Sequence, residues 1–134
     1  MDLPQKFLQY GTEVSFPAHT AVYRASDPVG PRPVFYVAAG LVKMDYPVRS
    51  ETFSLWLHPD SIFGLVEPLS EGTRLCTAQA MERTVCYTWD MDGFFTAAGV
   101  SWELALAAIT GMSRELRTLN AEFGERLRAA QKGA

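Results

Sequence analysis

The sequence has few of the residues that build catalytic and metal centres. Its 134 residues include two cysteines and two histidines. Cys76 and Cys86 cannot complete a closed zinc site by themselves, and His19 and His58 are too far apart in sequence to assist them convincingly. No Walker-type phosphate loop and no GxGxxG, HExxH or GxSxG motif is present. We therefore expect a protein that is not an enzyme, with two cysteines that act as small, semi-buried hydrophobic residues.

A basic excess is missing as well. The chain has 12 Lys and Arg against 15 Asp and Glu, a net charge of −3, so we do not expect it to bind DNA unaided. No apolar run approaches the roughly 18 residues of a membrane-spanning helix, and the first residues lack the features of a signal peptide. With 134 residues, of which 48% are hydrophobic, the chain is predicted to form one compact domain. Because no signal peptide or membrane-spanning segment is recognised, we expect this domain in the cytoplasm, without a membrane partner.

Short β-strands separated by turns are predicted over most of the chain. The segment 26–33 contains three prolines and a glycine, which exclude continuous ladder or helix bonding. Around it, apolar and β-branched residues cluster or alternate in 13–16, 20–24, 34–38, 41–46, 52–57, 73–81 and 84–89. Several strands at roughly 8–12-residue spacing are typical of a β-sandwich or jelly-roll barrel.

The pattern becomes helical after Trp89. A short helix is predicted over 91–98, ended by Gly99, and a long one from Val100 to about residue 130, where no proline occurs. Ser101 is placed to cap the long helix, while Gly111 and Gly124 are its weak positions.

Apolar residues on the long helix follow each other at alternating steps of three and four. This spacing is typical of a coiled-coil seam, and its members are Trp102, Ala105, Ile109, Met112, Leu116, Leu119 and Phe123. Leu104, Leu106 and Ala108 widen the stripe in the first half, which we expect to pack on the barrel. The second half predicts a homodimer through Ile109, Met112, Leu116, Leu119 and Phe123; a helix packed only on its own barrel is the alternative.

The order of barrel, short helix and seam helix resembles the effector domain of the Crp/Fnr transcriptional regulators, over about residues 11–127. Residues 35–43 (FYVAAGLVK) are similar to the family's hairpin, and residues 59–64 (PDSIFG) to the approach to its ligand cassette. The resemblance implies a mainly β fold with a C-terminal α part. A cyclic nucleotide-binding-like jelly roll (double-stranded β-helix) would cover 1–99, and a dimerisation helix 100–134.

The resemblance implies that the chain is a regulatory domain that senses a small-molecule effector. The family contacts DNA through a helix-turn-helix domain that follows the long helix, and this chain does not include one. The chain is accordingly interpreted as a piece of a longer regulator or as a stand-alone sensor domain.

The positions that hold a cyclic nucleotide in the family differ here. The ribose-binding glutamate after the cassette glycine is replaced by Leu65, and the phosphate-binding arginine and the serine after it by Leu75 and Cys76. Glu67 adds a carboxylate that would repel a phosphate, and Arg74 stands one residue early. A one-residue step points to the opposite face of a strand unless a bulge intervenes. We therefore expect an apolar pocket in which cAMP and cGMP are disfavoured.

The candidate effector site combines the cassette with the family's contact from the partner subunit's long helix. Its expected residues are Phe63, Gly64, Leu65, Val66, Glu67, Arg74, Leu75, Cys76, Thr77, Leu119 and Asn120. The iron–sulfur members need four cysteines, which excludes that cluster here. Haem-binding members use a terminal proline, a histidine or a cysteine; Pro4, His19, His58 and Cys76 occur in no spacing that specifies haem.

Two alternatives to an effector sensor remain at this stage. The barrel could be filled by its own side chains and serve as a dimerisation scaffold without a ligand. A cupin-type metalloenzyme shares the jelly roll, but its HxH metal-binding pair is missing from this sequence. The sequence identifies neither the effector, the target promoters nor the direction of regulation.

Overall fold

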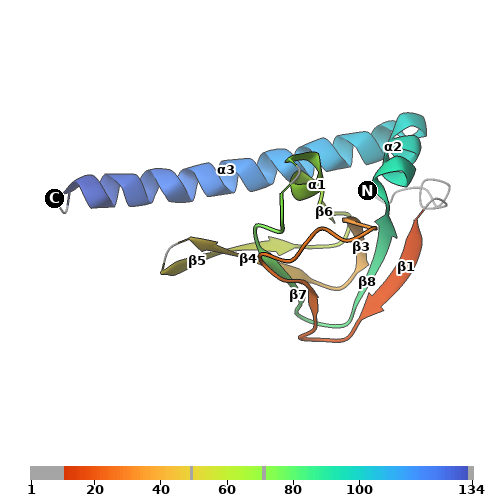
Figure 1. Ribbon diagram of the computed structural model, residues 1–134, viewed down its shortest axis with the longest axis horizontal. Helices are drawn as coiled ribbons and strands as arrows, with labels where there is room; N and C mark the ends of the chain where they lie inside the picture. The colour runs from red at the N-terminus through yellow and green to blue at the C-terminus, as the bar shows by residue number, and fades with distance from the viewer. Residues whose placement is uncertain (1–10, 49, 71, 133–134) are drawn as a thin grey trace.

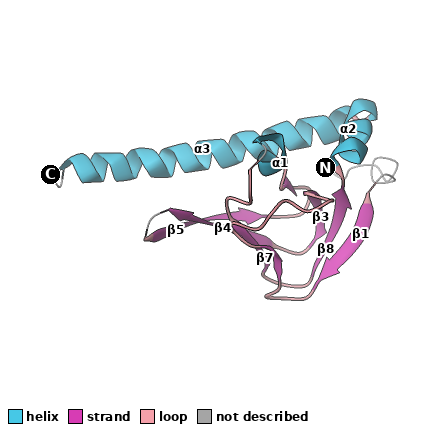
Figure 2. Ribbon diagram, viewed as in Figure 1, coloured by secondary structure: helices cyan, strands magenta, loops and turns pink. Residues whose placement is uncertain are grey.

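The structure, a computed structural model, describes residues 11–48, 50–70 and 72–132, without the side chains of 48, 122, 123 and 126–132. In this part of the chain, eight strands are followed or interrupted by three helices (Figures 1 and 2). The strands are β1 (Thr12–Phe16), β2 (Ala21–Tyr23), β3 (Val34–Ala39), β4 (Val42–Val48), β5 (Glu51–Leu57), β6 (Ile62–Phe63), β7 (Thr77–Ala80) and β8 (Thr84–Trp89). The helices are α1 (Val66–Ser70), α2 (Met91–Val100) and α3 (Trp102–Lys132).

The strands form two four-stranded antiparallel sheets, with orders β1-β8-β3-β6 and β2-β7-β4-β5. Closing two such sheets face to face gives the jelly-roll barrel that the strand pattern predicted. α3 runs along the outside of the barrel, and its C-terminal part continues past the barrel above the β4–β5 hairpin (Figure 1). The predicted fold, mainly β with a long C-terminal helix, is confirmed.

Two apolar cores lie on opposite faces of the first sheet. β3 is buried on both faces because Phe35 and Val37 point into the barrel, while Val34 and Tyr36 lie under α2 and α3. A strand that is covered on both faces needs apolar side chains at successive positions, which explains the apolar sequence of β3. The outer core joins the sheet to the helices through Trp89 and other buried residues, among them Phe94, Leu104 and Ala108.

Both C-terminal helices form where they were expected and the predicted Ser101 cap is confirmed, but the boundary differs, because Val100 ends α2 and α3 begins at Trp102. Asp90 caps α2 by accepting a hydrogen bond from the Gly93 amide at 2.6 Å, and Ser101 caps α3 by accepting one from the Leu104 amide at 3.0 Å. α2 continues to Val100, so Gly99 lies inside it and does not end it. Among the described residues, no single helix is long and apolar enough to cross a membrane; α2 and α3 together reach that length, and they are bent by 120°.

The segment between β5 and β7 differs from the prediction. It contains the short strand β6 and the one-turn helix α1, neither of which was predicted, and β7 begins at Thr77 although the strand was expected from residue 73. The backbone bends at residues 75 and 76, immediately before β7. This segment is the expected ligand cassette, and its irregular path determines which side chains enter the barrel.

Candidate functional site

Gly64 turns the chain from β6 into α1. Its φ is +86°, and a Cβ at this position would lie 2.2 Å from the Pro33 carbonyl oxygen and 3.3 Å from Arg74 Nη1. A side chain would therefore meet both positive-φ strain and a backbone atom, so only glycine fits here. The turn directs Glu67 of α1 inward, where its side chain is buried.

Arg74 is buried next to Glu67 and is surrounded by acceptors. Its Nη1 donates to the Gly64 carbonyl at 2.8 Å and to Glu67 Oε1 at 3.1 Å, and its Nη2 donates to the Pro33 carbonyl at 2.9 Å. The guanidinium carbon lies 4.0 Å from the centre of the Tyr23 ring, a cation–π contact. Each of these contacts favours the charged arginine in an environment that otherwise excludes it.

The Glu67 carboxylate connects three segments of the chain. While Oε1 receives the Arg74 guanidinium, Oε2 accepts a hydrogen bond from the Leu75 amide at 3.1 Å. Both side chains of the ion pair are 3% exposed. The ion pair therefore connects α1 to the segment that precedes β7. Through the Pro33 carbonyl, Arg74 also connects this segment to the residue before β3.

The orientation expected for Arg74 and Leu75 was wrong. Arg74 is 4% exposed and faces the barrel, whereas Leu75 is 55% exposed and points outward. The prediction assumed one continuous strand that placed Leu75 inside. In the structure, the Arg74 amide donates to the Asp27 carbonyl at 2.9 Å, and its carbonyl accepts from the Ser26 amide at 2.8 Å. These bonds to the loop after β2, followed by the bend before β7, turn Arg74 inward.

The other cassette residues fall into separate environments. Phe63 and Cys76 belong to the barrel core, but Leu65 packs in the outer core under the helices and so does not line the barrel interior. Val66 and Thr77 are half-buried, and the Thr77 hydroxyl accepts a hydrogen bond from the Ala25 amide at 3.1 Å. The structure therefore brings together only part of the expected set, around Arg74 and Glu67.

Two tyrosine hydroxyls are buried at the barrel core. Within the part of the chain that the structure describes, Tyr46 Oη makes no hydrogen bond, and Tyr23 Oη has the weakly polar Cys76 thiol beside it. Burial, together with nearby Cys76 and Glu67, raises the pKa of Tyr23 well above its ordinary value. Burial also raises the pKa of Cys76 to about 12, so this thiol stays protonated and unreactive at neutral pH. Sequence reasoning missed both hydroxyls because their burial depends on contacts between distant strands.

α3 reaches the barrel core through Leu119. This half-buried side chain packs against the cluster that contains Tyr23, Phe63 and Cys76, while Asn120 is exposed. Leu119 therefore lies at the barrel core as expected, but on the same chain; the contact predicted from the partner subunit is not tested by a single chain.

The predicted seam of α3 is divided between two surfaces. Ile109 and Leu116 are exposed, and Leu116 has 61% of its surface accessible. Met112 packs on the outer core and Leu119 on the barrel core, so these two already have intramolecular partners. The Phe123 side chain lies outside the described residues. Leu104 and Ala108 pack on the barrel side as predicted, whereas Leu106 is 41% exposed, contrary to the prediction.

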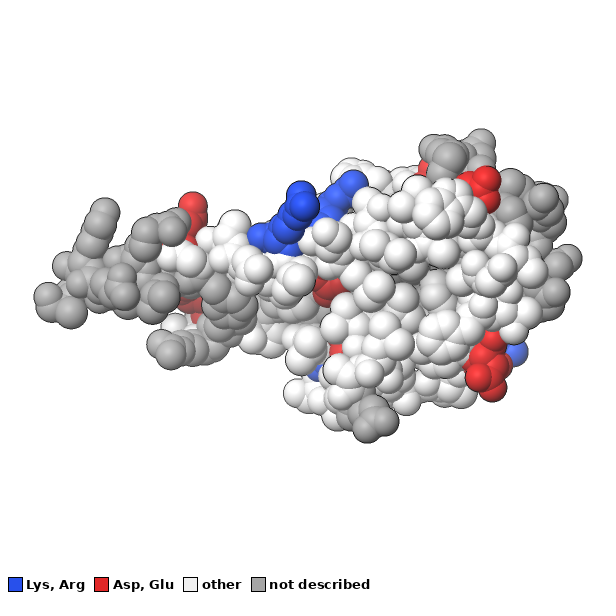
Figure 3. All heavy atoms as spheres, turned by 90° about the horizontal axis from the view of Figure 1, so that it is seen from above, with Lys and Arg blue, Asp and Glu red and all other residues white. Residues whose placement is uncertain are grey.

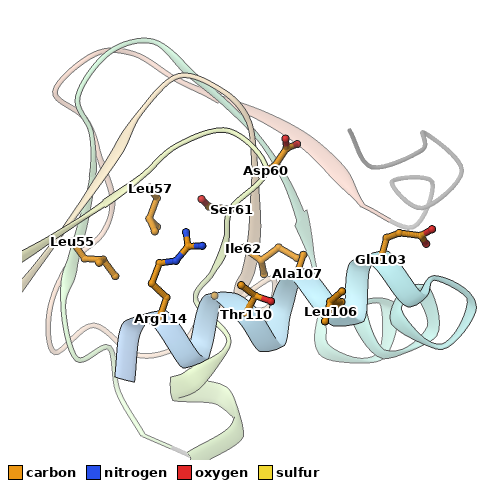
Figure 4. A pocket seen from close by; sticks show the side chains of 11 residues that line it. Leu55, Leu57, Asp60, Ser61, Ile62, Glu103, Leu106, Ala107, Thr110 and Arg114 are labelled. Atoms are coloured by element: carbon orange, nitrogen blue, oxygen red, sulfur yellow. The ribbon is translucent and has the colours of Figure 1, made fainter. Parts of the chain in front are cut away.

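A pocket of about 250 Å³ lies between α3 and the β5–β6 region (Figure 4). Leu55, Leu57 and Ile62 supply apolar surface, and Arg114 extends from α3 toward them. None of the residues expected to bind the effector lines this pocket, which is therefore distinct from the Arg74–Glu67 site.

These features define a jelly roll with a buried ion pair in its cassette and a long helix beside it. Its fold is shared by the haem domain of CooA from Carboxydothermus hydrogenoformans, with a TM-score of 0.78 and 16% identity over 93% of this chain and 87% of that one. The catabolite activator protein of Thermus thermophilus gives a TM-score of 0.73 and 22% identity over 90% of this chain. This chain spans 56% of the length of that protein.

An enzyme also contains this fold. A cAMP-binding acyltransferase from Mycobacterium smegmatis matches with a TM-score of 0.60 and 19% identity, over 69% of this chain and 28% of that one. No curated protein sequence is a significant match. The profile of the cyclic nucleotide-binding domain matches residues 13–98, which is more than half of the chain. The chain belongs to the cyclic nucleotide-binding domain family, which confirms the resemblance inferred from its cassette and hairpin.

Of the four candidate haem ligands, three lie among the described residues. His19 and His58 are exposed, and Cys76 is buried in the barrel core with the pKa of its thiol raised to about 12. Pro4 lies outside the described residues. Among the described residues, no three His, Cys, Asp or Glu side chains gather as metal ligands. A cyclic phosphate would meet Arg74, but this arginine is already paired with Glu67.

Proposed function

We propose that this chain is the effector-sensing, dimer-forming part of a Crp/Fnr-type transcriptional regulator, with the barrel in 1–99 and the dimerisation helix in 100–134. The contact of Leu119 with the barrel core carries this proposal. Through it, the helix that presents Ile109 and Leu116 to solvent also contacts the interior of the barrel. A molecule bound in the barrel would shift α3 only if it binds one position of Leu119 better than another.

The homodimer would form along the exposed flank of α3. Trp102, Ile109 and Leu116 occur at intervals of seven residues and leave 72%, 58% and 61% of their surfaces accessible. Seen from above, Lys and Arg side chains stand out near the middle of the described surface and Asp and Glu at several separate places, and the remaining described surface belongs to uncharged residues (Figure 3). An apolar stripe at heptad spacing is stabilised when it packs on a second copy, because neither copy can cover it alone.

The effector would be an apolar molecule or another ligand that is not a cyclic nucleotide. The barrel core is mostly aromatic and aliphatic, and its two buried tyrosine hydroxyls supply polar groups in a largely apolar site. DNA contact in such a regulator belongs to a helix-turn-helix unit that this chain does not include. We place the protein in the cytoplasm, where its two free cysteines remain reduced.

A dimerisation scaffold without a ligand is the second candidate. Phe35 and Phe63 stack in the barrel with ring centres 5.1 Å apart, and Tyr23 contacts both rings. Side chains that fill the interior in this way favour a barrel that needs no ligand.

Native mass spectrometry of the protein purified from its own host, followed by hydrogen exchange, tests the proposal. We expect a retained small molecule, whose removal lowers protection in residues 63–76 and in residues 112–123. The matched variant Leu119→Ala should keep the change in 63–76 and lose it in 112–123. A protein that carries no ligand would support the scaffold. Protection confined to the cassette in the wild type would contradict coupling between effector and helix.

A further inference from the structure

We propose that Glu67 is a built-in anion that occupies the barrel's buried arginine and so restricts the site to uncharged ligands. The inference rests on the proposed function of the barrel as an effector site. It assigns Glu67 the role of a specificity-determining residue, which acts by holding Arg74 and not by contacting the effector.

The first observation is that the Arg74 guanidinium already has an anionic partner in the cassette. Nη1 donates to two oxygens and Nη2 to a third, and the Tyr23 ring covers the face of the cation. Gly64 and Pro33 contribute neutral carbonyls, so Glu67 supplies the negative charge of the set. An anionic ligand at Arg74 would therefore compete with the Glu67 carboxylate for the charge of the guanidinium.

The second observation is that the carboxylate is held as a bound oxyanion would be. One oxygen receives a guanidinium N–H and the other receives the backbone N–H of Leu75, at 3.1 Å each. A phosphate or carboxylate ligand would seek the same combination of a fixed cation and a backbone donor. Glu67 thus contributes from α1 the group that the ligand would otherwise bring.

The third observation concerns what remains available to a ligand. With Arg74 neutralised, the hydroxyls left in the core, within the described residues, are that of Tyr46, which has no partner, and that of Tyr23, which lies beside the Cys76 thiol. Hydroxyls recognise neutral acceptors and donors, and a buried anion with only these partners would stay largely uncompensated. The ligand class is therefore an uncharged, mostly apolar molecule with an oxygen or nitrogen that reaches these hydroxyls.

The test compares cAMP with adenosine, which lacks the phosphate, by titration calorimetry at constant ionic strength. The wild type should show no preference for cAMP over adenosine. Glu67→Ala and Glu67→Gln should each bind cAMP roughly tenfold or more tightly than the wild type does, because Arg74 becomes available, with adenosine unchanged. The double variant Glu67→Ala/Arg74→Met should lose the gain, and Glu13→Gln, which removes a carboxylate at an exposed position of β1, should not produce it.

Glu67→Gln keeps the shape of the side chain and decides the question if Glu67→Ala does not fold. A wild type that prefers cAMP, or folded variants that gain no phosphate-dependent affinity, would overturn the inference. These outcomes are separable from the sensor itself. Variants that gain cAMP in a protein without a native effector would uphold the role of Glu67 and reject the sensor. If the wild type responds to a native effector and the variants gain no affinity for cAMP, the sensor is supported and the role of Glu67 is rejected.

Discussion

Gly64 determines the path of the backbone through the cassette. Gly64 has a positive φ and lies against the Pro33 carbonyl, the same carbonyl that accepts from Arg74. A methyl group there would push apart the two segments that hold the guanidinium. The identity of one residue therefore controls both the turn into α1 and the geometry of the buried ion pair.

We expect Gly64→Ala to lower the free energy of unfolding by roughly 2–5 kcal/mol, from positive-φ strain and from overlap with the backbone. Gly99→Ala is the matched control, because nothing lies within 4 Å of its added Cβ and the residue is helical. That variant should be neutral or more stable by about 0.5–1 kcal/mol. Urea unfolding of both proteins measures the difference; equal stabilities would contradict the role given to Gly64.

At the scale of the element, α3 has three different surfaces. Leu104 and Ala108 pack on the barrel side, and Gly111 allows close approach, since its Cβ would lie 2.9 Å from the Ile62 carbonyl oxygen. Ile109 and Leu116 form the exposed apolar stripe, and Arg114 faces the outer pocket. Gly111, which lowers helix propensity, is thus required by the distance between α3 and β6.

The start of α3 depends on the Ser101 hydroxyl. This buried group accepts the Leu104 amide at 3.0 Å and satisfies a donor that has no partner within the helix. Ser101→Ala should cost roughly 0.5–2 kcal/mol in urea unfolding. Ser113→Ala, at an exposed position inside the same helix, should leave stability almost unchanged. A loss of equal size in the two variants would show that the cap contributes nothing.

Glu115 gives α3 a dependence on pH. Burial raises the pKa of Glu115 from 4.5 to about 7, so the folded chain holds a proton that the unfolded chain has released. Stability should therefore fall as the pH rises from about 4.5 to about 7, and level off above that value. Glu115→Gln should remove this part of the fall when urea unfolding is measured across the range. An unchanged pH profile would contradict the shift.

At the scale of the whole molecule, two cores share the first sheet, and α3 contacts both of them. Met112 packs on the outer core and Leu119 on the barrel core, one helical heptad apart. Because both residues are already partly covered, the surface left for a second copy centres on Trp102, Ile109 and Leu116. The proposed dimer contact and the barrel contact are therefore neighbouring flanks of one helix.

Leu116→Glu should yield a monomer in analytical ultracentrifugation at tens of micromolar, because a charge at the two-fold seam would be unpaired in both subunits. Leu69→Glu is the matched control: Leu69 is also exposed, but it lies on α1. That variant should sediment as the wild type does. A wild type that is already monomeric, or a dimer that survives Leu116→Glu, would reject the seam.

The sequence by itself determined the jelly roll, the Ser101 cap and the apolar stripe of α3, because alternation, turn residues and heptad spacing are patterns set by local geometry. It did not determine which cassette side chains face inward. The bend before β7 and the hydrogen bonds of Arg74 to the loop after β2 made Arg74 internal and Leu75 external. The pairing of Arg74 with Glu67, and the burial of the Tyr23 and Tyr46 hydroxyls, likewise depend on segments far apart in the chain. Such contacts arise only when the sheets close, since burial and hydrogen-bond satisfaction are properties of the folded whole.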